Sequence, residues 1–159
     1  MYLKNLIDWQ GNAGFSGLFF ACGSFGVIDG DCNFAYEEKE KERIYRYDNG
    51  EITLVATFTE MKNGVVIRKD YLENVSKDVQ EISGLLSRFC MDGNAYDVYT
   101  QYNAWQHESS GGWQKLVTQV TAASEGIRTC DGATPMMALH NLYTKKILFF
   151  IFCRTPGGK

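Results

Sequence analysis

The feature that most constrains the fold is the alternating run Glu51–Thr59, which lies between two turn signals. This run is rich in β-branched residues and its even-numbered positions are apolar, a pattern typical of a strand with one face toward a core. The turn Asp48–Gly50 separates it from the strand-like run Arg43–Tyr47, and Lys62–Gly64 separates it from Val65–Leu72. Asn-Gly between two strand-like runs is a hairpin signature. The sequence therefore predicts three consecutive antiparallel strands.

Further strand-like runs follow along the chain. Val79–Phe89 also fits helical spacing, but Gly84 weakens a helix and the neighbouring strands favour β. Tyr96–Tyr102 alternates, Leu116–Val120 is a short candidate, and Ile147–Cys153 is typical of an apolar strand buried on both faces. Seven or more strands with only two prolines in the chain predict an all-β, antiparallel β-sandwich.

Composition narrows the class of protein. The length of 159 residues fits one domain, and 45% hydrophobic residues with 22% charged residues are close to the globular average. A net charge of -3 gives no electrostatic footprint for nucleic acid, so we expect no nucleic-acid partner. The charge run Glu37–Arg43 mixes signs at nearly every step, which predicts a solvated turn or a single helical turn.

Cysteine usage and the N-terminus indicate the compartment. The five cysteines are an odd number without a C-x-x-C pair or clustered histidines, which argues against a zinc site and against a complete disulfide framework. The chain start lacks the features of a secretory signal, and no apolar run reaches the length that spans a bilayer. We therefore expect a cytoplasmic protein with no membrane partner.

Aromatic and polar residues crowd the segment Thr100–Trp113, which contains Trp105 and a Ser109–Gly112 stretch typical of a turn. An indole stacks against the apolar face of a sugar ring, while amide and carboxylate side chains bond to its hydroxyls. Two interpretations follow. The segment is either a sugar-binding surface or a hairpin whose aromatics belong to the core.

The sequence contains no recognisable catalytic motif. A Ser or Cys nucleophile needs a histidine base, and neither His107 nor His140 lies in a recognisable motif. The chain has no phosphate-cradling loop, and His107 with Glu108 offers too few ligands for a metal. Four carboxylates are candidates for the acid pair of a glycoside hydrolase, although spacing brings no two of them together: Asp97, Glu108, Glu125 and Asp131. We predict no catalytic residue, metal or cofactor.

Five motifs, taken in order, carry a family resemblance. They are Arg68–Asn74, Glu81–Ser87, Tyr102–Ser109, Gly126–Thr129 and Pro135–Leu139. Their order resembles the N-terminal domain of family 36 glycoside hydrolases, the α-galactosidases and their relatives, over about Tyr45 to Gly158. The resemblance implies a large twisted β-sandwich of the supersandwich type that precedes a catalytic (β/α) barrel.

The resemblance also implies a role. In the family the catalytic aspartates belong to the barrel, and this chain ends before one begins, so we expect residues 1–159 to be a single, truncated, non-catalytic domain. Such a domain packs against the barrel, contributes to homo-oligomer contacts and forms one edge of a site for α-galactoside sugars. The matching substrate-binding positions are Trp105, Glu108 and Arg128, with a carboxylate partner inside the fold as the alternative role for Arg128.

Two other functions remain open from the residues. A free-standing carbohydrate-binding module is suggested by Trp105, Trp113 and the Ser109–Gly112 stretch. The second alternative is a small enzyme of an unrelated class, but the sequence contains no recognisable set of catalytic residues that supports it. Exposure of Ile147–Cys153 as an unpaired edge would favour association of the chain with itself.

Overall fold

The computed structural model describes residues 19–23, 26–27, 33–89, 91, 95–104, 106–117, 119–120 and 132–152, which form mainly antiparallel strands. The chain divides into two compact units, Met1–Met91 and Asp92–Lys159. The all-β antiparallel class expected from the sequence is confirmed. A single domain over the whole chain stays a prediction, and each unit is described by itself.

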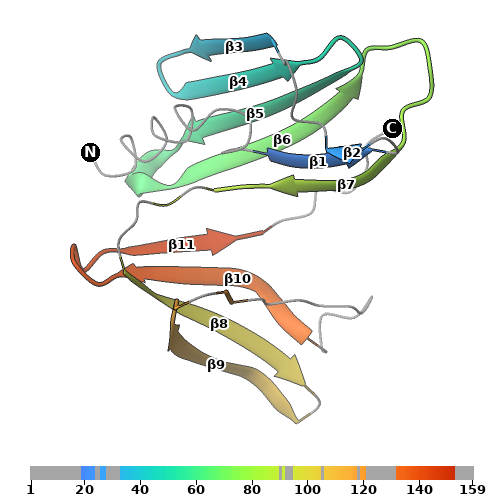
Figure 1. The fold of residues 1–159 in the computed structure, drawn as a ribbon. Helices are drawn as coiled ribbons and strands as arrows, with labels where there is room; N and C mark the ends of the chain where they lie inside the picture. The colour runs from blue at the N-terminus through green and yellow to red at the C-terminus, as the bar shows by residue number, and fades with distance from the viewer. Residues whose placement is uncertain are drawn as a thin grey trace. The chain divides into compact units, whose positions relative to one another are not determined.

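The first unit holds two antiparallel sheets (Figure 1). One has the order β3-β4-β5-β6 and the other the order β2-β1-β7. The strands are β1 (Phe19–Gly23), β2 (Gly26–Val27), β3 (Asn33–Glu38), β4 (Glu42–Asp48), β5 (Ile52–Glu60), β6 (Val66–Asn74) and β7 (Ile82–Ser87), with a short 3-10 helix η1 (Lys62–Gly64) between β5 and β6.

Local turn chemistry joins β4 to β5 as the sequence predicts. Gly50 has a φ of 87°, a backbone conformation that residues with a Cβ atom disfavour. The side-chain oxygen of Asn49 accepts hydrogen bonds from the backbone N–H groups of Glu51 and Ile52, at 3.0 and 2.8 Å. The second turn contains Asn63 at φ 64° and Gly64 at φ 76° within η1. Both predicted hairpins of the first unit are therefore confirmed.

The core of the first unit lies on one face of the four-stranded sheet. Even-numbered residues of β5 lie opposite odd-numbered residues of β4, so that Tyr45 faces Ala56 and Tyr47 faces Leu54. These side chains are buried together with Ile52 and Phe58, and Ile82 of β7 packs against them. Two sheets therefore enclose one apolar layer, which is the arrangement of a sandwich.

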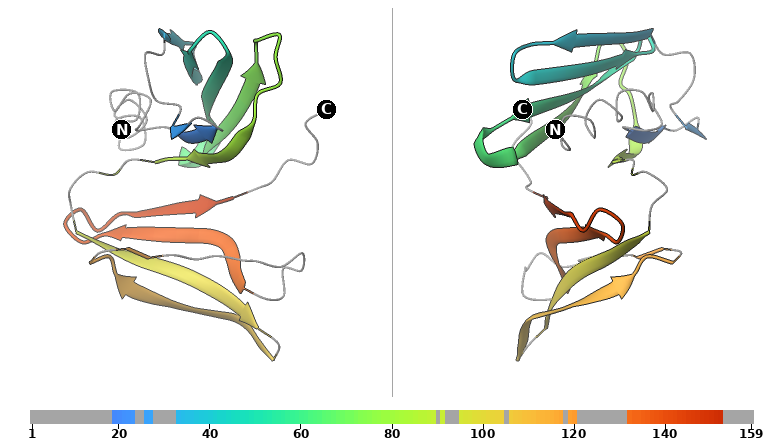
Figure 2. Two further views of the ribbon diagram at one scale, coloured as in Figure 1. Left: turned by 45° about the vertical axis from the view of Figure 1, so that its right-hand side comes forward. Right: turned by 90° about the vertical axis from the view of Figure 1, so that its left-hand side faces the viewer.

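The second unit is one four-stranded antiparallel sheet with the order β11-β10-β8-β9 (Figure 1). Its strands are β8 (Tyr96–Ala104), β9 (His107–Lys115), β10 (Gly132–Asn141) and β11 (Ile147–Ile151). The register between β8 and β10 shifts between Ala133 and Met137, and β10 bends near its start in Figure 1. Figure 2 shows the twist of the strands within each sheet from two further directions.

The two faces of the second sheet differ in exposure. Tyr96, Val98 and Thr100 of β8 point to one face and are buried, with Leu139 and Asn141 of β10 on the same side. The opposite face carries the odd-numbered residues of β8 and remains partly open to solvent. One face therefore serves the core and the other is available for contacts.

Several expectations can now be compared with the structure. The ambiguous run Val79–Phe89 contains β7, so the β interpretation is confirmed. The short candidate Leu116–Val120 is wrong, because its described residues 116, 117, 119 and 120 lie outside any strand. Ile147–Cys153 was expected to be buried on both faces, and this is also wrong: β11 is an edge strand whose odd-numbered residues are exposed. Cys153 lies outside the described residues.

Candidate functional site

Three ring side chains meet on the open face of the second sheet. Tyr99 of β8 and Trp113 of β9 have ring centroids 5.5 Å apart, and the His140 ring of β10 meets the Trp113 ring edge-on at 6.0 Å. Trp113 is half exposed, at 50% of its full accessible surface. We call Tyr99, Trp113 and His140 the aromatic patch.

Strand register brings the aromatic patch together. Trp113 lies directly opposite Tyr99 in the β8–β9 pair, and His140 lies opposite Asp97 in the β8–β10 pair. Directly opposed residues of antiparallel strands point to the same face. Gly111 precedes Trp113 by two residues in β9 and therefore lies on the same face. A Cβ atom at position 111 would overlap the Tyr99 hydroxyl. Because residue 111 is a glycine, the Tyr99 side chain can lie over it, beside Trp113.

Charged and polar groups border the aromatic patch. Asp97 lies between His140 and Lys115, and its Oδ2 is 4.0 Å from His140 Nδ1. Both side chains of this pair keep about a quarter of their surface exposed. Gln101, two residues further along β8, donates its side-chain amide N–H to the Ser109 carbonyl oxygen at 3.2 Å. Apolar rings and hydrogen-bonding groups thus share one accessible face.

This arrangement places groups that can recognise a ligand on one accessible face. A half-exposed indole offers a flat apolar surface, and Asp97 and His140 offer an acceptor and a donor beside it. The patch can hold a flat ligand with hydroxyl groups at its rim.

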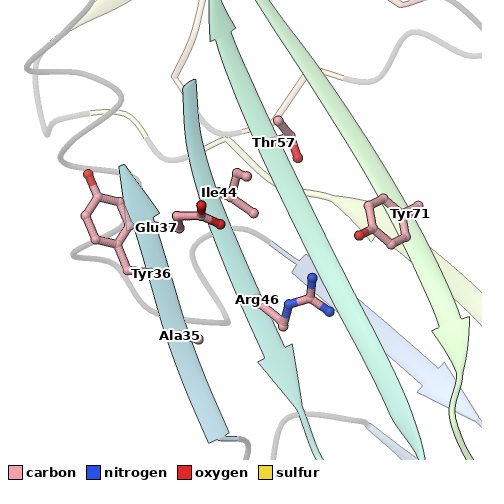
Figure 3. Close-up of a pocket in the computed structure, with 7 residues that line it drawn as sticks. All are labelled: Ala35, Tyr36, Glu37, Ile44, Arg46, Thr57 and Tyr71. Atoms are coloured by element: carbon pink, nitrogen blue, oxygen red, sulfur yellow. The ribbon is translucent and has the colours of Figure 1, made fainter. Parts of the chain in front are cut away.

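A second candidate is an open hollow of about 150 Å³ on the outer face of the four-stranded sheet of the first unit (Figure 3). Figure 3 shows Ile44 and Arg46 of β4 between Tyr36 of β3 on one side and Tyr71 of β6 on the other. Among the described residues, no group forms an ion pair or hydrogen bond with the Arg46 guanidinium, and the residue is exposed. The hollow is lined by Ala35, Tyr36, Glu37, Ile44, Arg46, Thr57 and Tyr71. It contains the half-exposed rings of Tyr36 and Tyr71, which come from the two edge strands β3 and β6 and lie on opposite sides of the hollow in Figure 3, so they form no joint stacking surface like that of the aromatic patch.

The substrate-binding positions expected from the sequence are not brought together by the described part of the structure. Trp105 and Arg128 lie outside the described residues, and Glu108 lies in β9 with a side chain that is likewise outside them. The expected turn Ser109–Gly112 is wrong, because these residues belong to β9. The β8–β9 connection instead falls around Gln106, which has a φ of 65°.

Sequence reasoning missed Tyr99 and His140 as members of a site. A signal was present in the alternation of β8, which places Asp97, Tyr99 and Gln101 on one face. The pairing of that face with Trp113 and His140 depends on register, which the alternation does not specify. Of the four carboxylates weighed for hydrolysis, Asp97 alone has a described side chain, and its partner is a histidine.

Two searches across the described residues gave negative results. They contain no group of three or more His, Cys, Asp or Glu side chains arranged to hold a metal ion. Within the same ranges, no helix has the length and apolar character needed to cross a membrane.

The fold and the patch define an all-β antiparallel protein with an exposed aromatic surface on one sheet. Comparison with protein-family models, curated proteins and solved structures found no match.

Proposed function

We propose that this chain is a non-catalytic β-sandwich domain that binds sugar on the open face of the β8–β9–β10 sheet. The observation that carries the proposal is the half-exposed Trp113, which contacts the Tyr99 ring and the His140 ring, with Asp97 beside His140. Stacking of an indole on a pyranose with polar groups at its edge is the usual physical basis of sugar recognition.

We further propose that the parent protein is an α-galactosidase-like enzyme of family 36 and that this chain is its N-terminal domain. The support for this assignment is the order of the five motifs in the sequence; in the structure Arg68–Asn74 lies in β6, Glu81–Ser87 contains β7 and Pro135–Leu139 lies in β10. The motif Tyr102–Ser109 contains the β8–β9 connection, next to the aromatic patch. In this proposal Trp105, Glu108 and Arg128 complete the sugar site, and the barrel supplies the chemistry.

Calorimetric titration with galactose, melibiose and raffinose tests sugar binding. We expect saturation with a dissociation constant of about 1 mM or tighter, and at least about a tenfold loss of affinity in Trp113→Ala. The matched control is Tyr71→Ala, which removes a half-exposed ring from the hollow of the first unit. Absence of heat with all three sugars, or loss of binding in Tyr71→Ala instead, would contradict the assignment of the aromatic patch.

A turnover assay separates a binding domain from an enzyme. We expect the 159-residue chain to release no phenol from an aryl α-galactoside, because Asp97 faces a histidine and no second carboxylate among the described residues. Turnover that survives repurification would overturn the non-catalytic assignment.

The alternative is a free-standing carbohydrate-binding module, favoured by the same exposed Trp113. The two proposals differ in what the coding region encodes after Lys159. A (β/α) barrel there supports the enzyme domain, whereas binding of sugars by a chain with no barrel supports the module.

A further inference from the structure

β11 is an open edge of the second sheet. In the order β11-β10-β8-β9 it pairs with β10 alone among the described strands. The backbone N–H of Phe152 donates to Pro135 and the backbone carbonyl of Lys146 accepts from Asn141, so the even-numbered residues of this stretch direct their backbone groups toward β10. Because these groups alternate along an antiparallel strand, Ile147, Phe149 and Ile151 direct their N–H and C=O groups to the open side.

The side chains of those same three residues are also exposed. Ile147, Phe149 and Ile151 keep 59%, 51% and 67% of their accessible surface and point to one face. Natural edge strands are usually protected by a charge, a proline or a bulge, and β11 contains none of these. The other edge of this sheet, β9, carries Glu108, Lys115 and two glycines, so it is protected where β11 is not.

The residue order of β11 fits its own copy. When two such strands run antiparallel with Phe149 opposite Phe149 of the partner subunit, Ile147 lies opposite Ile151 of the partner subunit. Each of these opposed residues has its backbone groups on the open side, so the facing pairs exchange both hydrogen bonds. Apolar residues then meet apolar residues along the whole strand.

Charge placement agrees with the same register. Lys145 and Lys146 precede β11, so a two-fold arrangement puts the two lysine pairs at opposite ends of the paired strands. Six residues of extended chain separate Lys146 from its symmetry mate, a distance of about 20 Å, which exceeds the screening length in physiological salt. Repulsion between the lysines is therefore weak.

We propose that β11 pairs with β11 of a second copy of this chain, antiparallel and centred on Phe149, and joins two four-stranded sheets into one continuous sheet. Trp113 lies on β9 at the other edge of the sheet, whereas His140 of β10 lies directly opposite Ile147; the proposed pairing uses backbone groups of β11 and does not depend on sugar binding. A symmetric dimer of this kind closes on itself, because the open edge of each copy is used up by the other.

Cysteine cross-linking tests the register. Opposed residues of a hydrogen-bonded antiparallel pair have Cα atoms about 5.5 Å apart, within the range of a disulfide, so Phe149→Cys should form a 149–149 disulfide on mild oxidation. The matched control is Ile147→Cys, whose two copies would lie about 14 Å apart and should stay unlinked. The unsubstituted chain, treated identically, gives the baseline from its own cysteines, and peptide mapping identifies the bond.

Sedimentation velocity tests the association itself. The chain should be dimeric at about 100 µM, and Phe149→Lys should raise the dimer dissociation constant at least about tenfold because it places two like charges opposite each other. Val79→Lys adds the same charge at a residue that is 98% exposed and outside any strand, and should leave the dimer intact. A monomeric unsubstituted chain at this concentration, or cross-linking through 147 but not 149, would overturn the proposal.

Discussion

The two four-stranded sheets have similar strand lengths and the same antiparallel pairing, yet one cluster of contacting aromatic rings is buried in the first unit and another is accessible in the second. In the first unit Tyr45, Tyr47 and Phe58 lie on the buried face and are at most 3% exposed. In the second unit Tyr99 and Trp113 lie on the face that solvent reaches. Aromatic content alone therefore does not separate a core from a binding surface; the face of the sheet does.

The two units also differ in what fills their buried face. The first has a continuous layer of apolar side chains enclosed by a second sheet. The second has Tyr96 and Val98 beside a buried amide, Asn141. The first sheet also buries Arg43 and Thr53, so both sheets combine apolar burial with buried polar groups, and the second differs in placing a buried amide beside Tyr96 and Val98.

The largest effect should come from the apolar layer of the first unit. Phe58 is 2% exposed and its ring meets Tyr45 edge-on at 5.8 Å. Phe58→Ala removes this ring from a packed site and should lower the free energy of unfolding by about 3 to 5 kcal/mol. Urea denaturation followed by far-UV circular dichroism measures the change.

The control for Phe58→Ala is the same substitution on the edge strand of the same sheet. Phe34 is 53% exposed and touches the Tyr47 ring at a centroid distance of 5.2 Å. Phe34→Ala should cost about 1 kcal/mol, because water already covers much of the ring. Equal losses in the two variants would mean that the layer is less enclosed than the distribution of buried residues indicates.

A buried amide closes the β10–β11 connection in the second unit. The Asn141 side-chain oxygen accepts the backbone N–H groups of Tyr143 and Thr144 at 3.0 and 2.9 Å, and its amide donates to the Tyr96 hydroxyl at 3.1 Å. Asn141→Ala removes the hydrogen-bond partner of the two backbone N–H groups and of the Tyr96 hydroxyl at a place that water hardly reaches. We therefore expect the free energy of unfolding to fall by about 2 to 3 kcal/mol.

Asn49 provides a matched test in the first unit. Its side-chain oxygen also accepts two backbone N–H groups in a hairpin turn, but the residue is exposed. Asn49→Ala should cost about 1 kcal/mol or less, since water can replace the lost acceptor. If both asparagine variants lose the same stability in chemical denaturation, burial does not distinguish the two turns.

How far the fold was predictable depends on the kind of signal. Glu51–Thr59 and its flanking turns specify local pairing, because alternation and Asn-Gly act within one hairpin. Sheet order is set by contacts between segments that are distant in the sequence. The apolar sequence of Ile147–Ile151 therefore does not specify whether this strand is central or at an edge. That is why a strand expected to be covered on both faces proved to be an edge.

The candidate site was predictable only in part. The segment Thr100–Trp113 was identified, and Trp113 does lie on an accessible face. His140 is distant in sequence and reaches the aromatic patch through the β8–β10 register. The charge run Glu37–Arg43 was also predictable only in part. Lys39 and Glu42 exchange backbone hydrogen bonds in a turn, as expected, but Arg43 is buried.

Neighbouring glycines of β9 give a sharper test of the open face of the second unit. A Cβ at Gly111 would overlap the Tyr99 hydroxyl, whereas a Cβ at Gly112 meets nothing within 4 Å. Gly111→Ala should displace the Tyr99 ring, lower stability by about 1 to 2 kcal/mol and weaken sugar binding by the aromatic patch. Gly112→Ala should leave both nearly unchanged. Thermal unfolding and the calorimetric titration measure the two effects, and equal behaviour of the two variants would argue against Tyr99 as a support of Trp113.

The smallest expected effect concerns a charge at the buried face of the first unit. The Arg43 guanidinium is buried and bonds to Glu38 at 2.9 Å, whereas the exposed pair of Glu37 and Lys39 on the same edge lies at 3.2 Å. Glu38→Gln should cost about 1 kcal/mol, because a buried guanidinium loses a charged partner that is itself half exposed, and Glu37→Gln should cost about 0.3 kcal/mol or less. Urea midpoints of the two variants, measured at low and high salt, provide the comparison. A loss in Glu38→Gln as large as that in Asn141→Ala would show that the first unit depends on a buried polar contact as strongly as the second, and the contrast between the two sheets would then rest on their aromatic faces alone.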